Sequence, residues 1–205
     1  MRKTLPSQAV RACAALLLLL VSASALAEVR VAAWNIQRFG WGEKKDYEAV
    51  AAVIEHFDLI AVIELMRPEA LDDLERRLER RTGEGWATLE SDAIGRSSYK
   101  EHYGFIWRES RIEYVDGALV FIDTDDTFAR EPFSARFRNR ENGEVFALAA
   151  VHILYGDSVR DRVPELKALA EYWDYLAQAY PRTPRIPVRC SVRTRRVRVL
   201  HHPVR

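Results

Sequence analysis

A compact polar cluster, Gly95-Arg-Ser-Ser-Tyr-Lys-Glu101, lies between apolar runs, and an apolar segment much later in the chain, Phe146–Val151, ends in His152. A histidine can donate or accept a proton near neutral pH when neighbouring groups fix its orientation and its protonated ring nitrogen. The cluster supplies Tyr99 and Glu101 for this purpose. These residue types predict general acid or base catalysis by His152, with Glu101 and Tyr99 in supporting roles.

Two further polar side chains follow apolar segments. Asn35 comes after the strand-like segment Val29–Trp34, and Glu64 comes directly after the apolar run Leu59–Ile63. Because polar groups at strand ends converge at one edge of a layered fold, these side chains can meet His152 in one site. Each also has an ordinary structural interpretation: Asn35 as a turn residue, Glu64 as a solvated acid, and His152 as a hydrogen-bonded residue at a sheet end.

The secondary structure that would position these residues can be predicted from the hydrophobic pattern. Hydrophobic periodicity predicts first a strand at Val29–Trp34, a helix at Lys45–His56, a strand at Leu59–Ile63 and a helix that begins at Pro68. The pattern then changes to strands at Trp86–Leu89, Tyr103–Trp107, Ile112–Phe121, Phe133–Arg138 and Val145–His152. A last helix, Val163–Tyr180, turns Leu166, Leu169, Trp173 and Leu176 towards the core. The order predicts an α+β fold with stacked sheets and helices outside them.

Residues 1–27 have the three parts of a secretory signal peptide. Arg2 and Lys3 precede an apolar run, and Ala25-Leu-Ala27 has the small residues of a cleavage site. We therefore expect a secreted or periplasmic protein, cleaved near Ala27, with no membrane-spanning segment. Cys190 is then the single thiol of the mature chain, so an internal disulfide is excluded.

The charge is distributed unevenly along the chain. Residues 182–205 contain eight arginines and no acidic residue, whereas residues 28–181 contain 30 acidic and 20 basic residues. We interpret 28–181 as one domain and 182–205 as a disordered arginine-rich tail, because the tail sustains neither a helical nor a strand period. An acidic body that acts on a polyanion needs a divalent cation to offset the repulsion.

Five segments, taken in this order, resemble the endonuclease/exonuclease/phosphatase superfamily and more closely its deoxyribonuclease I branch. They are Ala32–Gly40 (AAWNIQRFG), Phe57–Glu64 (FDLIAVIE), Gly95–Glu101 (GRSSYKE), Phe128–Pro132 (FAREP) and Ala149–His152 (AAVH). The resemblance runs from about Val29 to Tyr180. It implies a four-layer α/β/β/α sandwich and a metal-dependent phosphodiesterase that cuts DNA.

The resemblance also assigns roles. Glu64 matches the family's metal-binding carboxylate, and Asn35 matches a residue beside the metal and the scissile phosphate. His152 matches one of two catalytic histidines, with Glu101 as its orienting acid and Tyr99 as a phosphate-side contact. Arg130 matches a phosphate-binding arginine. The implied cofactor is Mg²⁺, with Ca²⁺ and Mn²⁺ as alternatives.

The substrate is less sharply defined than the chemistry. Ile63 stands where the family often has glutamine, and Met66 stands where the pancreatic enzyme has a groove-reading arginine. DNA is the favoured nucleic-acid partner, and RNA and small phosphodiesters stay open. A phosphatase or a sphingomyelinase-like lipid hydrolase of the same superfamily is a further alternative, which the Gly95–Glu101 segment argues against. The oligomeric state is not defined by the sequence.

The family's second set of site residues has no match in this chain. The family continues into a Gly-Asp-x-Asn segment and a Ser-Asp-His segment, whereas here an arginine-rich sequence follows Pro181. We expect an N-terminal portion of the domain, truncated or frameshifted after about residue 181, whose first sheet lacks most of its partner sheet. Little or no nuclease activity follows. The alternative function is non-catalytic binding of nucleic acid or an anionic surface by the basic tail.

Overall fold

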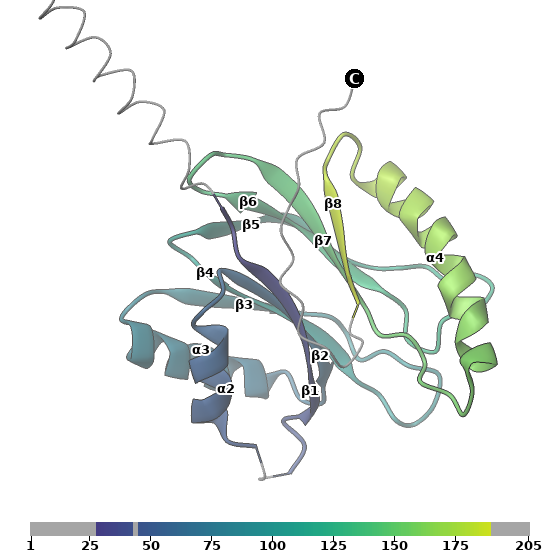
Figure 1. Cartoon of the computed structure of the whole chain (residues 1–205), viewed down its shortest axis with the longest axis horizontal. Coiled ribbons are helices and arrows are strands. Elements are labelled where there is room, and N and C mark those ends of the chain that lie inside the picture. The colour runs from purple at the N-terminus through teal and green to yellow at the C-terminus, as the bar shows by residue number, and fades with distance from the viewer. Residues whose placement is uncertain (1–27, 43–44, 190–205) are drawn as a thin grey trace, which may run out of the picture.

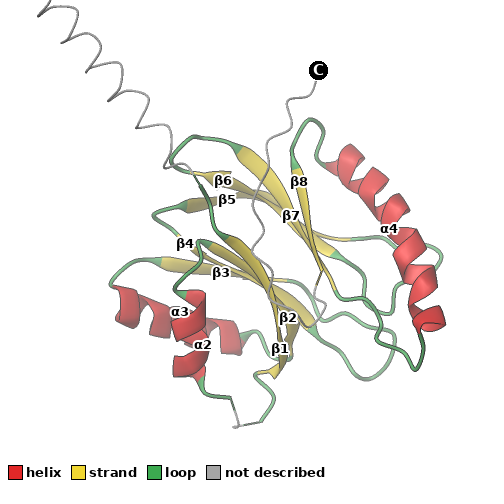
Figure 2. Ribbon diagram, in the orientation of Figure 1, coloured by secondary structure: helices red, strands yellow, loops and turns green. Residues whose placement is uncertain are grey.

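The computed structural model describes residues 28–42 and 45–189. Two four-stranded sheets lie face to face, and helices cover the outer face of each sheet (Figures 1 and 2). The prediction of an α+β, four-layer α/β/β/α sandwich is therefore confirmed. The proposed signal peptide, 1–27, and most of the proposed tail, 190–205, lie outside the described residues. In the described part of the chain, no helix has the length and apolar character needed to cross a bilayer.

The first sheet has the strand order β1-β2-β4-β3. Its strands are β1 (Val31–Phe39), β2 (Leu59–Leu65), β3 (Trp86–Glu90) and β4 (His102–Arg108). β1 and β2 are parallel, and β4 is antiparallel to both β2 and β3. Helices α2 (Tyr47–Ile54) and α3 (Glu69–Thr82) cover the outer face of this sheet (Figure 1). Asp46 begins α2 by accepting hydrogen bonds from the backbone N–H groups of Glu48 and Ala49.

The second sheet has the order β5-β6-β7-β8. Its strands are β5 (Ile112–Val120), β6 (Phe133–Asn139), β7 (Val145–Val151) and β8 (Arg185–Arg189). The first three are antiparallel neighbours, and β8 pairs with β7 in parallel. Helix α4 (Val159–Ala179) connects these two strands and lies on the outer face of the sheet (Figure 2).

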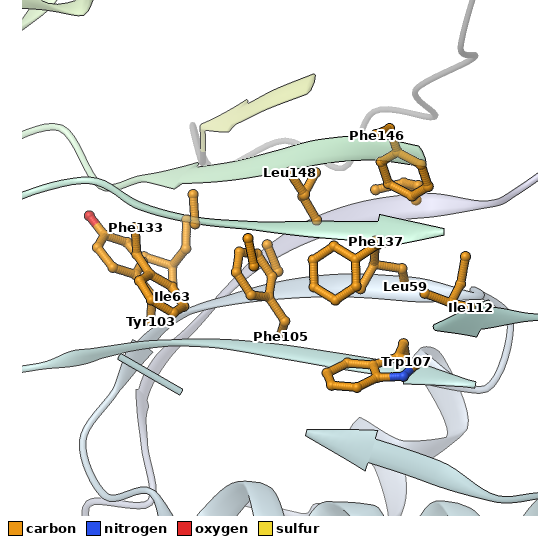
Figure 3. Close-up of a cluster of buried hydrophobic side chains, with 14 of the residues drawn as sticks. Leu59, Ile63, Tyr103, Phe105, Trp107, Ile112, Phe133, Phe137, Phe146 and Leu148 are labelled. Carbon is orange, nitrogen blue, oxygen red and sulfur yellow. The ribbon is translucent and has the colours of Figure 1, made fainter. Parts of the chain in front are cut away.

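The main core lies between the two sheets. Tyr103, Phe105 and Trp107 of β4 face Phe133 and Phe137 of β6 across this layer (Figure 3). The rings interlock: Phe105 stacks on Phe133 and meets Phe137 edge-on, with centroids 5.3 Å apart in both pairs. The expectation that the first sheet lacks most of its partner is therefore wrong, because β5 to β8 cover its inner face.

Two further expectations need correction near the end of the chain. Arg185–Arg189 forms β8, so the prediction of a disordered tail over 182–205 is wrong for this segment. Its pairing with β7 outweighs Pro184, just before the strand, and Pro187, within it. Helix α4 buries part of the predicted face, since Leu176 is buried and Leu169 packs against the core, but Leu166 and Trp173 are exposed and Glu165 and Tyr172 are buried in addition. Glu165 is buried because its carboxylate accepts hydrogen bonds from two backbone amides. Hydrophobic periodicity does not predict the burial of such an acid.

Candidate active site

Strand alternation brings two of the predicted site residues to the same inter-sheet rim. In β4 the odd-numbered residues Tyr103 and Phe105 point into the inter-sheet core, and Glu101 continues that side just before the strand begins. In β7 the even-numbered residues Phe146, Leu148 and Ala150 point into the same core, and His152 continues that side just past the strand's end. Two strands of different sheets therefore direct Glu101 and His152 towards each other.

Glu64 reaches the same rim only because β2 is irregular. Ile60 and Val62 point outward to the helices, so regular alternation would also turn Glu64 outward. The β2–β4 register shifts between Val62 and Leu65, and Leu65 takes the outward position instead. Glu64 itself has φ 60°, a left-handed conformation that costs free energy for a residue with a Cβ. The bulge thus redirects the Glu64 side chain to the rim.

A matching irregularity in β1 places a backbone amide on Glu64. Gln37 and Arg38 have φ of 55° and 56°, and the β1–β2 register shifts between Asn35 and Phe39. The Glu64 carboxylate accepts hydrogen bonds from Asn35 Nδ2 at 2.6 Å and from the Arg38 backbone N–H at 3.1 Å. Asn35 Oδ1 in turn accepts from the Gln37 N–H at 2.7 Å. Both bulges therefore hold one carboxylate in a fixed orientation.

His152 is oriented by a buried acid. Its Nδ1 lies 2.5 Å from Glu101 Oε1, and its Nε2 lies 3.6 Å from Glu64 Oε1. Because a carboxylate can only accept, the Glu101 contact assigns the proton to Nδ1 and leaves Nε2 to exchange a proton with a substrate. Glu101 is 1% exposed, and its second oxygen forms an ion pair with Arg130 Nε at 3.0 Å without receiving a hydrogen bond of good geometry.

The tyrosine that contacts His152 is one that the sequence analysis did not select. Tyr103 Oη accepts a hydrogen bond from the His152 backbone N–H at 2.8 Å. Burial raises the pKa of Tyr103 well above its ordinary value, and the adjacent Glu101 charge adds to the effect, so the phenol stays protonated. Tyr99 instead donates to Met66 Sδ at 3.7 Å and lines the cleft in front of Glu64. Its predicted phosphate-side position is compatible with this location, but an orienting role towards His152 is not.

All six predicted residues meet at one place. Five of them form a continuous series of contacts: Asn35 with Glu64, Glu64 with His152, His152 with Glu101, and Glu101 with Arg130. The sixth, Tyr99, lines the cleft in front of them. In front of them lies an open cleft of about 710 Å³, whose lining residues are Gln37, Arg38, Trp41, Lys45, Glu64, Tyr99, Arg130 and Tyr155. Its lining carries three cationic side chains and one carboxylate, a balance that suits an anionic ligand.

Helix α4 anchors the loops that carry two of these residues. Glu165 is 2% exposed, and its carboxylate accepts hydrogen bonds from the backbone N–H groups of Ala129 at 2.7 Å and Leu154 at 2.6 Å. Ala129 directly precedes Arg130, and Leu154 lies two residues after His152. A single buried carboxylate therefore fixes both loops relative to each other. Sequence reasoning missed it because an acid inside an amphipathic helix resembles a solvated residue.

Replacing Glu165 by glutamine is expected to lower the free energy of unfolding by about 1–3 kcal/mol, because one of the two buried amides then faces an NH₂ donor. Chemical denaturation with circular dichroism measures this change. The exposed Glu171→Gln on the same helix is the matched control and should leave the stability unchanged. Equal stabilities for the two variants would mean that Glu165 does not hold these loops.

The donor set around Glu64 suits one class of metal ion. Within residues 28–42 and 45–189 no group of three or more His, Cys, Asp or Glu side chains is arranged to hold a metal. Mg²⁺ does not require such a group, since it commonly binds one or two carboxylates and completes its shell with water and substrate phosphate. Each Glu64 oxygen accepts one hydrogen bond and keeps a further lone pair. Glu64 therefore fits Mg²⁺ held jointly with a phosphate.

The chain is similar in sequence to known deoxyribonucleases. The chain is 52% identical over 168 residues to a deoxyribonuclease of Thioalkalivibrio sp. (strain K90mix), an alignment that covers 82% of this chain and 46% of that protein. It is 32% identical over 129 residues to human deoxyribonuclease-1-like 2, covering 60% and 43% of the two chains. No protein-family model matches. The chain spans about half the length of the curated relatives it matches.

The fold also has solved counterparts. A structure of an endonuclease/exonuclease/phosphatase family protein from Bacteroides thetaiotaomicron superposes with a TM-score of 0.61, covering 78% of this chain and 62% of that one, at 17% identity. At this identity the likeness concerns the fold alone.

Proposed function

The chain belongs to the deoxyribonuclease I-like branch of the endonuclease/exonuclease/phosphatase family, and on that premise we propose that it hydrolyses phosphodiester bonds of DNA with the help of Mg²⁺. The observation that carries the proposal is the contact series Asn35–Glu64–His152–Glu101–Arg130 at the rim of a cationic cleft. It combines a hard oxygen ligand, an oriented imidazole and a guanidinium. Hydrolysis of a phosphodiester uses these three kinds of group.

Each residue has a distinct role in this proposal. His152 exchanges a proton at Nε2 with the reacting oxygen, while Glu101 holds the proton on Nδ1 and stabilises the imidazolium when it forms. Arg130 binds a phosphate oxygen, and Asn35 orients the Glu64 carboxylate. Glu64 would hold Mg²⁺, which polarises the phosphoryl oxygen when bound.

We expect the residues that the structure describes to hydrolyse a phosphodiester only slowly. In-line displacement is fastest when one group activates the attacking water and a second protonates the leaving oxygen. Within the part of the chain that the structure describes, His152 is the imidazole that contacts Glu64. Removing one member of a cooperating catalytic set lowers rates by orders of magnitude. We therefore expect a rate at least about 1,000-fold below that of the Thioalkalivibrio relative.

Plasmid nicking with purified protein tests the proposal. Slow nicking is expected in Mg²⁺ and none in EDTA, and Glu64→Gln should reduce nicking about 100-fold because the neutral amide is a poorer Mg²⁺ ligand. Glu69→Gln, at the exposed start of α3, is the matched control and should retain the wild-type rate. Nicking that survives EDTA or Glu64→Gln would reject the metal-dependent mechanism. Complete absence of nicking by the folded protein would reject catalysis.

A substrate panel addresses the choice of diester. DNA is expected to be cut, and RNA and phosphomonoesters serve as the comparison substrates. Faster hydrolysis of a phosphomonoester than of DNA would replace the nuclease proposal by a phosphatase one. Export from the cell, which the pattern of residues 1–27 suggested, is part of the same proposal, and fractionation of expressing cells tests it. Binding through the basic tail rests mostly on residues outside the described ranges, and no contact of the described residues favours it.

A further inference from the structure

The cleft in front of Glu64 is lined by aromatic as well as cationic side chains. Trp41, Tyr99 and Tyr155 share its lining with Arg38, Lys45 and Arg130. Trp41 is 57% exposed and Tyr155 is 79% exposed. A single exposed ring is ordinary on a protein surface, but several aromatic side chains that share one cleft indicate a binding surface. A phosphate ester alone gives no reason for them, since phosphate binding requires cations and N–H donors.

The Trp41 side chain is oriented by its neighbours but stays exposed to solvent. Its backbone N–H donates to the Arg38 carbonyl at 3.1 Å, closing a turn just after β1. The Arg38 guanidinium lies 5.6 Å from the indole centroid, and the Tyr99 ring lies 5.8 Å away at an interplanar angle of 57°. These neighbours orient the indole, yet more than half of it stays open to solvent. The ring is therefore a preformed surface beside the proposed catalytic residues.

Tyr155 is supported in the same manner. Arg162 of α4 places its guanidinium 4.7 Å from the Tyr155 ring centroid, and its Nε donates to the Tyr155 carbonyl at 2.6 Å. Both exposed rings of the cleft thus have an arginine on one side. An arginine-backed ring with an exposed remainder can stack on a second flat group.

The lining continues past Trp41 into a second hollow. This neighbouring cleft of about 430 Å³ is lined by Gly40, Trp41, Gly42, Tyr47, Arg67, Asp73 and Arg77. Trp41 therefore lies between two adjoining clefts, and each of them contains an aromatic ring and at least two cations. A chain that alternates flat bases with phosphates matches this alternation of rings and positive charges.

We propose that this surface binds unstacked bases of a single nucleic-acid strand, with Trp41 as the principal stacking residue and Tyr155 as a second one. The inference rests on the proposed phosphodiester chemistry and adds the form of the substrate. Bases within a duplex expose only their edges in the grooves, so a ring cannot stack on them unless the duplex opens. Stacking on an aromatic side chain requires no particular base, and every base offers a flat face. Single-stranded DNA and single-stranded RNA share this chemistry.

Binding of short labelled oligonucleotides by the full chain in EDTA, where hydrolysis does not proceed, tests the inference. Fluorescence anisotropy compares single-stranded DNA, single-stranded RNA, duplex DNA and an abasic strand. We expect base-bearing single strands to bind at least about tenfold more tightly than the duplex and the abasic strand. Trp41→Ala should remove this preference, and Trp41→Phe should retain part of it.

Trp173→Ala provides the matched control. Trp173 is also exposed, at 37%, and has the Arg185 guanidinium 4.7 Å from its ring centroid, but it lies on α4 and does not line the cleft. Its replacement should leave the preference unchanged. Circular dichroism establishes that each variant is folded.

The outcomes separate this inference from the proposed function. Equal binding of the base-bearing and abasic strands, tighter binding of the duplex, or a Trp41→Ala protein with wild-type preference would overturn the stacking inference alone. Failure of every strand, abasic included, to bind at low salt would also overturn the stacking inference, while plasmid nicking in Mg²⁺ decides the proposed function separately. Binding of RNA but not DNA would restrict the stacking surface to RNA and contradict the DNA substrate.

Discussion

Replacing His152 by alanine is expected to lower phosphodiester hydrolysis by about 100- to 10,000-fold, the contribution that a positioned acid or base makes to such reactions. The imidazole is the group in the contact series whose Nε2 is available to exchange a proton, since Glu101 occupies Nδ1. Single-turnover cleavage of labelled DNA, with protein in excess and Mg²⁺ present, measures the rate even when turnover is slow. The variant should still bind DNA, because Arg130 and the other cleft cations are untouched.

His102→Ala is the matched control for this experiment. His102 follows Glu101 in the chain but points to the opposite side of β4, where its Nδ1 contacts the Ser91 carbonyl at 2.7 Å. Its loss should leave the cleavage rate at the wild-type value. Equal rates for His152→Ala and the wild type would place the proton transfer on another group. A fall in both variants would instead indicate loss of the folded structure, which thermal melting of each protein would reveal.

The layered fold was predictable because its strands carry clear local signals. Leu59–Ile63 and Phe146–Val151 are continuous apolar runs, and both became strands buried on two faces. β8 was not predictable in this way, because Pro187 lies within it and an arginine stands at each of its ends. Its strand conformation depends on the backbone of β7, a contact between distant segments that composition does not reveal.

The partner sheet was misjudged for a related reason. Strand-like segments such as Phe133–Arg138 were identified, but the sequence does not state which sheet a strand joins. Phe133 and Phe137 prove to cover Phe105, so the described strands already form a two-sheet core. The burial of these rings stabilises the part of the chain that the structure describes.

The site residues were predictable by type, but their orientation was not. Period-two alternation would have turned Glu64 towards the helices, and the bulge with φ 60° is what redirects it. Tyr103 was missed because a tyrosine in an apolar run resembles a core residue, and it is indeed buried. Both cases share a physical reason: the hydrogen-bonding partners of these residues are distant in sequence, so local pattern carries no information about them.

Strain at Glu64 has a bearing on function. Three neighbouring non-glycine residues of the site, Gln37, Arg38 and Glu64, adopt left-handed backbone conformations, which cost free energy in the folded state. The hydrogen bonds from Asn35 and Arg38 to the Glu64 carboxylate offset part of this cost. Left-handed residues that cost free energy but are held by hydrogen bonds are typical of functional sites, where they fix the position of a reacting group.

Glu101→Gln is expected to lower cleavage by about 100- to 10,000-fold while leaving every atom position nearly the same. The glutamine loses the negative charge that stabilises an imidazolium at His152, and its NH₂ can face Nδ1 and force the proton onto Nε2. The neutral ring then carries its proton on Nε2, the reverse of the wild-type arrangement, so the proton exchange proposed for Nε2 is impaired. Arg130 also loses its ion-pair partner, which is held at 3.0 Å in the wild-type protein.

A structural role for Glu101 alone would predict a different set of observations. ¹⁵N chemical shifts of the His152 ring report which nitrogen carries the proton, and they should change in Glu101→Gln while a folded spectrum is retained. Glu101→Asp keeps the charge with a shorter reach, so it should restore part of the rate, whereas a purely structural residue would tolerate the isosteric glutamine better than the shorter aspartate. Wild-type cleavage by Glu101→Gln, or an unchanged His152 tautomer accompanied by the full loss of rate, would show that Glu101 does not act through the imidazole.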